Sequence, residues 1–66
     1  MKKTKIVASL GPNSRELETI LNMARLGVDV FRINLSHASF KECDDLIEKI
    51  REVEKKVKKV IGIMLD

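Results

Sequence analysis

The stretch Val30-Phe31-Arg32-Ile33-Asn34-Leu35 in the middle of the chain decides the fold. Successive side chains of an extended segment point to opposite faces, so Phe31, Ile33 and Leu35 share one face, and Arg32 and Asn34 share the other with Val30. This strict alternation predicts a β-strand over residues 30–35 that packs its apolar face on a core. The polar side chains of the second face gather toward the C-terminal end of the strand.

The residues before this stretch predict a strand and a helix. Residues 6–10 form a short apolar run rich in β-branched side chains, and Pro12 closes it because proline has no N–H for a ladder. Apolar side chains then recur at helical spacing, which predicts a helix over about residues 15–26. Gly27 is expected to end this helix, since glycine adopts a left-handed conformation without strain.

The residues after the central stretch repeat this order of helix and strand. Ser39 and Glu42 have the spacing of a capping box and predict the start of a second helix. Its apolar stripe consists of Cys43, Leu46, Ile47, Ile50, Val53 and Val57. Residues 60–65 are apolar on both faces, which is typical of a strand inside a parallel sheet.

The expected fold class is therefore α/β, with the element order βαβαβ. Short connections and right-handed crossovers make the strands parallel and adjacent. Ligands of such sheets bind at the carboxyl ends of the strands. In this chain those ends are residues 9–13, residues 34–38 and Asp66.

Length and composition limit the chain to one small unit. Its 66 residues are 44% hydrophobic and carry a net charge of +3, and a chain of this size buries only about 60% of its unfolded surface. The small positive excess and the lack of Trp and Tyr argue against a nucleic-acid partner. The longest apolar run, residues 60–65, is far shorter than the roughly 20 residues of a membrane helix. We therefore expect no membrane partner and a cytoplasmic chain with a reduced thiol.

Arg32, Asn34 and Ser36 follow one another at period two near the end of the predicted central strand. Arginine offers a planar fork to phosphate or carboxylate oxygens, and Asn and Ser offer neutral oxygens to a cation. Asp66 joins them at the same rim if the third strand lies beside the central one. These oxygens suit a hard cation better than zinc or copper. The same residue types are also common loop hydrogen-bonders, and the pattern alone leaves both interpretations open.

Three other features support weaker hypotheses. His37 follows a strand, where contact with a ligand is more plausible than acid–base chemistry. Cys43 lies on the apolar stripe of the second helix, where a thiol packs as a small hydrophobe. The lysines between residues 55 and 59 suit a solvated helix C-terminus, with contact to a polyanion as the alternative.

Three segments resemble one protein family. They are TKIVASLGPNS (residues 4–14), GVDVFRINLSH (27–37) and IMLD (63–66). In this order and spacing they are similar to the N-terminal barrel segment of pyruvate kinases, which transfer the phosphoryl group of phosphoenolpyruvate to ADP on a (β/α)₈ barrel. The resemblance implies that residues 1–66 are the N-terminal part of such a barrel domain, a βαβαβ segment truncated after its third strand.

The resemblance also implies roles for individual residues. Arg32 would contact the phosphoryl group of phosphoenolpyruvate, and Asn34, Ser36 and Asp66 would bind potassium. The site for ADP or ATP would be lined by Asn34, Leu35, Ser36 and His37. The magnesium ligands of the family would lie beyond this chain, and the parent enzyme would be a homotetramer. Positioning and neutralisation of charge dominate phosphoryl transfer, which agrees with such a set of residues.

Three functions follow from these patterns. The leading hypothesis is an N-terminal fragment of a pyruvate kinase, a glycolytic enzyme that produces pyruvate and ATP, with the fragment inactive alone. The alternative is a free-standing βαβαβ module that binds a small phosphorylated ligand through Arg32 and the helix N-termini. The third is an interaction segment whose exposed sheet edges pair with another chain.

Overall fold

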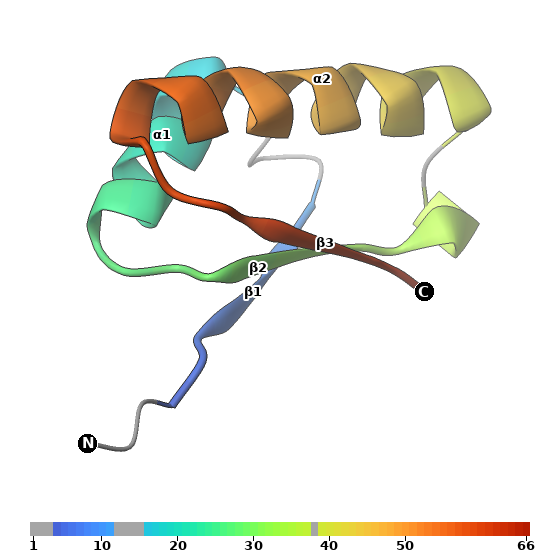
Figure 1. Cartoon of the computed structure of the whole chain (residues 1–66). Coiled ribbons are helices and arrows are strands. Elements are labelled where there is room, and N and C mark those ends of the chain that lie inside the picture. The colour runs from blue at the N-terminus through green and yellow to red at the C-terminus, as the bar shows by residue number, and fades with distance from the viewer. Residues whose placement is uncertain (1–3, 12–15, 38) are drawn as a thin grey trace.

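The computed structural model describes residues 4–11, 16–37 and 39–66. In chain order the elements are β1 (Val7–Leu10), α1 (Leu17–Arg25), β2 (Val30–Ile33), a 3₁₀ helix (Leu35–His37), α2 (Phe40–Val57) and β3 (Gly62–Leu65), as drawn in Figure 1. This order is the expected βαβαβ.

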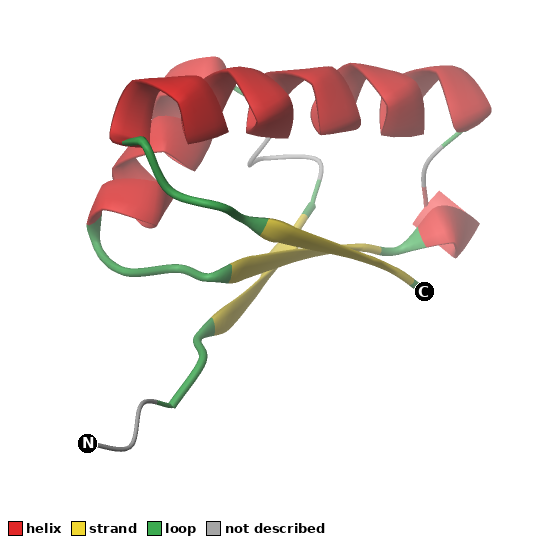
Figure 2. Ribbon diagram, viewed as in Figure 1, coloured by secondary structure: helices red, strands yellow, loops and turns green. Residues whose placement is uncertain are grey.

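The three strands form one parallel sheet in the order β1-β2-β3, as predicted. The register places Ala8 beside Phe31 and Phe31 beside Ile63, so these side chains point to the same face. Both helices lie on that face, and the opposite face of the sheet is left open (Figures 1 and 2).

The core lies between the sheet and the two helices. Phe31 and Ile33 from β2 are fully buried there, as the alternation of the central stretch predicts. The rest of the buried apolar set consists of Leu10, Ile20, Ala24, Val28, Cys43, Leu46, Ile50, Val53 and Ile61. Cys43 is a free, buried thiol, in agreement with its place on the apolar stripe of α2.

Local signals set the ends of the helices. Gly27 has a φ of 115°, and the N–H groups of Gly27 and Val28 donate to the carbonyls of Ala24 and Met23 at 3.1 Å. This is the paired bonding of a glycine-terminated helix. At the start of α2, the side chain of Ser39 accepts from the Glu42 N–H while the Glu42 side chain accepts from the Ser39 N–H.

The predicted start of the first helix lies in part outside the described residues. Within them, α1 begins at Leu17, and Glu16 occupies the N-cap without a side-chain cap. Two of the strands also begin later than predicted, β1 at Val7 and β3 at Gly62.

The central strand is shorter than predicted, which is a correction with consequences for the site. Strand β2 ends at Ile33, and Leu35 opens a 3₁₀ helix with its side chain 40% exposed. The reason is local, because Asn34 Oδ1 accepts from the Ser36 N–H at 3.0 Å and turns the backbone. The prediction that Arg32, Asn34 and Ser36 lie on one side of an extended segment is therefore wrong beyond Asn34.

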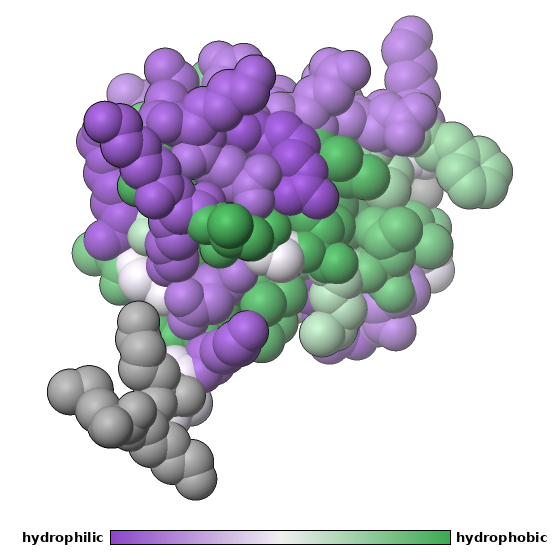
Figure 3. All heavy atoms as spheres, viewed as in Figure 1, coloured by the Kyte–Doolittle hydropathy of each residue, from purple (hydrophilic) through white to green (hydrophobic). Residues whose placement is uncertain are grey.

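The open face of the sheet carries the alternate side chains of each strand, those that point away from the helices. Its side chains, by register, are those of Val7, Ser9, Val30, Arg32 and Met64, together with Gly62. Val7 and Met64 are 50% and 46% exposed. Figure 3 shows hydrophilic side chains over the outer surface of α2 and hydrophobic ones gathered toward the side where the strands end. Within the described ranges, neither helix is long and apolar enough to cross a membrane.

Candidate functional site

The carboxyl ends of β2 and β3 meet in a polar rim, which we define as Arg32, Asn34, Ser36 and Asp66. Asp66 follows β3, and its N–H donates to the Ile33 carbonyl at 3.0 Å. The Leu35 N–H in turn donates to the Asp66 carbonyl at 2.7 Å. These two bonds hold Asp66 beside the end of β2, in the neighbourhood that the strand order predicts.

Arg32 and Asp66 make a direct ion pair through Nη2 and Oδ2. Both side chains belong to the open face, because Arg32 is aligned with Met64 and Asp66 lies two residues beyond Met64. They are 45% and 50% exposed, so the pair is open to solvent and to ligands. The sequence placed both residues at one rim but did not predict their contact. The signal for it was the alternation of side chains along neighbouring strands, which points Arg32, Met64 and Asp66 to the same face of the sheet.

Asn34 and Ser36 form the second half of the polar rim. Ser36 Oγ donates to Asn34 Oδ1 at 2.6 Å, and the Ser36 N–H donates to the same oxygen at 3.0 Å. The loop hydrogen bonding that was one of the two open interpretations is therefore present. It also brings an amide oxygen and a hydroxyl oxygen within 2.6 Å of each other. His37 ends the 3₁₀ helix, and its side chain lies outside the described part of the structure.

The oxygen atoms of the polar rim are of the chemical type that hard cations prefer. Asn34 Oδ1, Ser36 Oγ and the carboxylate of Asp66 provide two neutral oxygens and one charged oxygen group. Hard cations prefer such oxygen ligands. Across the described ranges, no group of three or more His, Cys, Asp or Glu residues could hold a metal ion. The assignment of Asn34, Ser36 and Asp66 to a cation stays a prediction.

A second charged network lies at the opposite, N-terminal ends of the strands, and sequence reasoning missed it. Glu54 accepts from the Ile61 N–H at 2.7 Å and from Arg51 Nη1 at 2.9 Å. Lys59 donates to the Val28 carbonyl at 3.1 Å and pairs with Asp29 at 3.0 Å. The Ile61 N–H lowers the pKa of Glu54, Arg51 acts in the same direction, and burial opposes them.

This network joins the C-terminal end of α2 to the starts of β2 and β3. Asp29 also accepts from the Ile6 N–H at 2.9 Å, which adds the segment before β1. The contacts stabilise the connections between elements, and they lie away from the carboxyl ends of the strands, where ligands of α/β sheets bind.

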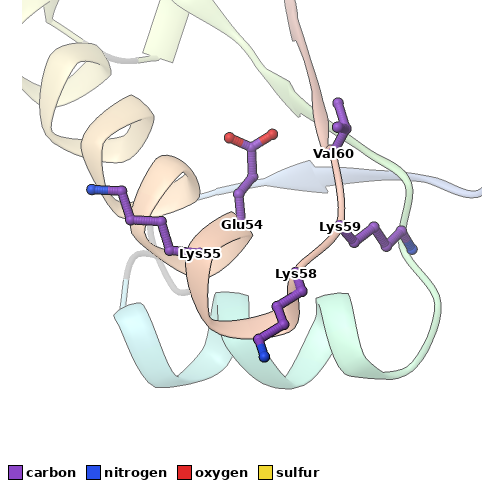
Figure 4. Close-up of a pocket in the computed structure, with 5 residues that line it drawn as sticks. All are labelled: Glu54, Lys55, Lys58, Lys59 and Val60. Atoms are coloured by element: carbon purple, nitrogen blue, oxygen red, sulfur yellow. The ribbon is translucent and has the colours of Figure 1, made fainter.

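A shallow hollow of about 290 Å³ lies beside this network, lined by Glu54, Lys55, Lys58, Lys59 and Val60 (Figure 4). Two of its charged side chains, Glu54 and Lys59, already have the partners described above. The carbonyl end of α2 disfavours an anion there. The solvated helix end and the polyanion contact both stay predictions.

The fold and the polar rim together define a class of protein. Parallel strands with helices on one face, and polar side chains at their carboxyl ends, are the arrangement of a (β/α)₈ barrel segment. A family model described as "Pyruvate kinase, barrel domain" matches residues 1–66, so the chain belongs to the pyruvate kinase family.

Individual relatives agree with the family match. The pyruvate kinase of Lactobacillus delbrueckii subsp. bulgaricus is 52% identical over 66 residues, which is all of this chain and 11% of that protein. The pyruvate kinase of Thermotoga maritima is 44% identical over 66 residues, again all of this chain, and 14% of that protein. A crystal structure of a pyruvate kinase from Cryptosporidium parvum superposes with a TM-score of 0.91 at 32% identity, covering 98% of this chain and 13% of the other.

The chain thus spans between 11% and 14% of the length of these curated relatives. The family and the barrel fold that the sequence predicted are confirmed. The roles of the individual rim residues stay predictions.

Proposed function

We propose that residues 1–66 are the N-terminal part of the catalytic barrel domain of a pyruvate kinase. The whole protein would transfer the phosphoryl group of phosphoenolpyruvate to ADP and produce pyruvate and ATP. The observation that carries this proposal is the polar rim, in which the Arg32 guanidinium pairs with Asp66, and Ser36 bonds to Asn34, at the carboxyl ends of parallel strands.

Arg32 is the residue that we assign to the phosphoryl group of phosphoenolpyruvate. Its guanidinium is half exposed on the open face of the sheet, which is the inner face of a closed barrel. Among the described residues, the Arg32 guanidinium is hydrogen-bonded through Nη2 alone, so the remaining donors of the fork are available to phosphate oxygens.

Asn34, Ser36 and Asp66 are the residues that we assign to potassium. Their oxygens fit the ion in chemical type, and two backbone hydrogen bonds, from the Asp66 N–H to the Ile33 carbonyl and from the Leu35 N–H to the Asp66 carbonyl, hold Asp66 beside the end of β2. When bound, potassium would supply positive charge near the transferred phosphoryl group. Within the chain, Ser36 Oγ donates to Asn34 Oδ1, and Asp66 pairs with Arg32.

The nucleotide contact is the third part of the proposal. We assign it to Asn34, Leu35, Ser36 and His37, which form the turn and the 3₁₀ helix after β2. A solved structure of the Cryptosporidium parvum pyruvate kinase contains ADP, and it superposes on 98% of this chain with a TM-score of 0.89. That similarity supports a nucleotide partner. Magnesium would be bound by residues of the whole enzyme outside this segment.

The whole enzyme would be a cytoplasmic homotetramer that acts in glycolysis, and the segment alone would be inactive. Membership in the family supports the first statement. The second is supported by the polar rim, which holds only part of a phosphoryl-transfer site.

A chimera tests this function. In it, the present chain replaces the matched 66 residues of the Lactobacillus delbrueckii enzyme. We expect an active chimera in which Arg32→Lys lowers kcat/KM by about 1.5–3 kcal/mol, roughly 10- to 150-fold, because an ammonium cannot reproduce a charge-assisted fork.

The matched control is Arg25→Lys, an equally conservative change at an exposed position in the last turn of α1. It should leave kcat/KM near that of the unmodified chimera. A folded but inactive chimera would contradict the family role and favour a free-standing binding module. Unchanged kinetics for Arg32→Lys would remove Arg32 from the phosphoryl site.

A further inference from the structure

The outer edge of β3 is the edge of the sheet that faces away from β2. Among the described strands, β3 has β2 as its only neighbour. The N–H groups of Gly62 and Asp66 donate toward β2, at 2.9 and 3.0 Å, so the even-numbered residues of this segment face that strand. Backbone groups alternate in direction along a strand, so those of Ile61, Ile63 and Leu65 face outward. A further strand would bond to these outward groups.

Two side chains of α2 occupy the outward groups at the first of these positions. Glu54 Oε2 accepts from the Ile61 N–H at 2.7 Å, and Arg51 Nη1 donates to the Ile61 carbonyl at 3.3 Å. Arg51 Nη1 also donates to Glu54 Oε1 at 2.9 Å, which joins the two side chains to each other. Together they make the two bonds that a neighbouring strand would make with Ile61. We call Arg51 and Glu54 the Ile61 clamp.

The Ile61 clamp lies at the start of an uncharged, apolar segment. Residues 60–65 contain no charged residue, no proline and a single glycine. Short segments of this kind stack as identical strands from chain to chain. Lys58 and Lys59 precede the segment and Asp66 follows it, which is where natural sequences place charged residues that oppose such stacking.

We propose that the Ile61 clamp guards the outer edge of β3 against pairing with a strand of a second copy of this chain. The clamp leaves only Ile63 and Leu65 facing outward, and a very short edge is a poor template for a further strand. Ile61 is held at the clamp because its side chain is 1% exposed in the core. The inference is independent of the proposed function. It narrows the hypothesis of an interaction segment, because the edge at β3 is closed at its start.

The test breaks the Ile61 clamp without changing the net charge of the chain. In the purified 66-residue chain, Arg51→Ala and Glu54→Ala are introduced together, because alanine favours a helix. The matched control is Glu52→Ala with Lys56→Ala, which removes one acid and one base from exposed positions of the same helix. Circular dichroism compares the helix content of the variants. Thioflavin T reports stacked strands, and contacts between sheet faces add no strand to the sheet, so the dye distinguishes edge pairing from them.

The expected effect follows from the backbone groups that the variant frees. Freeing Ile61 adds up to two backbone hydrogen bonds to each edge contact, and each changes an association constant by about fivefold. The concentration at which thioflavin-positive assemblies appear should therefore fall by about 5- to 30-fold, and the control should match the unmodified chain. Adding Leu65→Pro should reverse the fall, because proline removes an outward N–H at a side chain that is 52% exposed.

Each other outcome overturns the proposal or leaves the unmodified chain to decide it. An equal threshold in the clamp variant and the unmodified chain would show that the clamp guards nothing, and an equal fall in the control would show that the effect is not specific to Ile61. Assemblies that persist with Leu65→Pro would form elsewhere than at β3. If the clamp variant does not fold, Leu65→Pro is compared with the unmodified chain. Thioflavin-positive assemblies that this substitution abolishes would refute a guarded edge, and unchanged association would support it.

Discussion

The open face of the sheet leads to a prediction about the purified 66-residue chain. The chain exposes 4894 Å² of surface at a mass of 7.5 kDa. A folded monomer of that mass exposes about 4,250 Å², so the excess is about 650 Å². The open face contributes to the exposed surface through Val7 and Met64, which are 50% and 46% exposed, and each partner contributes roughly 800 Å² to a stable complex. We therefore expect the isolated chain to associate with itself through the open face.

The perturbation that tests this expectation is Met64→Lys. Met64 lies on the open face of β3 and is 46% exposed. Covering the exposed half of such a side chain contributes roughly 1 kcal/mol. A symmetric dimer contains the position twice, so the substitution should cost about 2 kcal/mol, or roughly a 30-fold weaker association.

The assay is sedimentation equilibrium over a concentration series, with circular dichroism to compare helix content. Val60→Lys is the matched control, because Val60 is 88% exposed but precedes β3 and lies outside the sheet face. It should leave the association constant unchanged. A chain that is a folded monomer at all concentrations would refute the packing argument. An equal effect of the two lysines would refute the assignment of the association to the open face.

Three further predictions follow from the site and its surroundings. The isolated chain should give no pyruvate in a coupled assay with phosphoenolpyruvate and ADP, and measurable turnover would contradict the inactivity proposed for the segment. Activity of the chimera should rise with potassium and fail with lithium, and Asp66→Asn should weaken that dependence, whereas equal rates in both salts would contradict the cation assignment. Glu54→Gln should lower the free energy of unfolding of the chain by about 1–2 kcal/mol at neutral pH, because it weakens charge-assisted bonds from Ile61 and Arg51. Since folding lowers the pKa of Glu54 below its usual 4.5, this contribution is complete above that value and is lost as the pH falls through the folded-state pKa. Denaturation curves from neutral to acidic pH should therefore converge for the two chains, and a constant difference would contradict the assignment.

Local signals in the sequence were sufficient for the elements and their order. The alternation around Phe31, the stripe of α2, the capping box at Ser39 and the glycine at position 27 each act within a few residues. Such signals need no knowledge of the rest of the chain, because hydrophobic periodicity and cap chemistry are properties of the segment itself. Short connections then allowed only a parallel sheet, which placed Asp66 near the end of β2.

The length of β2 was a case in which two local signals competed. Alternation favoured extension to Leu35, and the side chain of Asn34 favoured a turn. The turn prevailed because Asn34 Oδ1 accepts two hydrogen bonds from Ser36, and it leaves Leu35 40% exposed. The residue types alone did not show whether the strand would continue to Leu35 or turn at Asn34.

The contacts between distant residues were decided by the tertiary structure alone. The pair between Arg32 and Asp66 joins positions 34 residues apart, and the bond between Lys59 and the Val28 carbonyl joins positions 31 residues apart. Each depends on the register of neighbouring strands or on where α2 ends over the sheet. A shift of one residue in register would turn Asp66 to the other face of the sheet. The sequence by itself therefore determined which residues gather at the polar rim, and only the tertiary structure decided which of them touch, because contact depends on register and side-chain direction across separate strands.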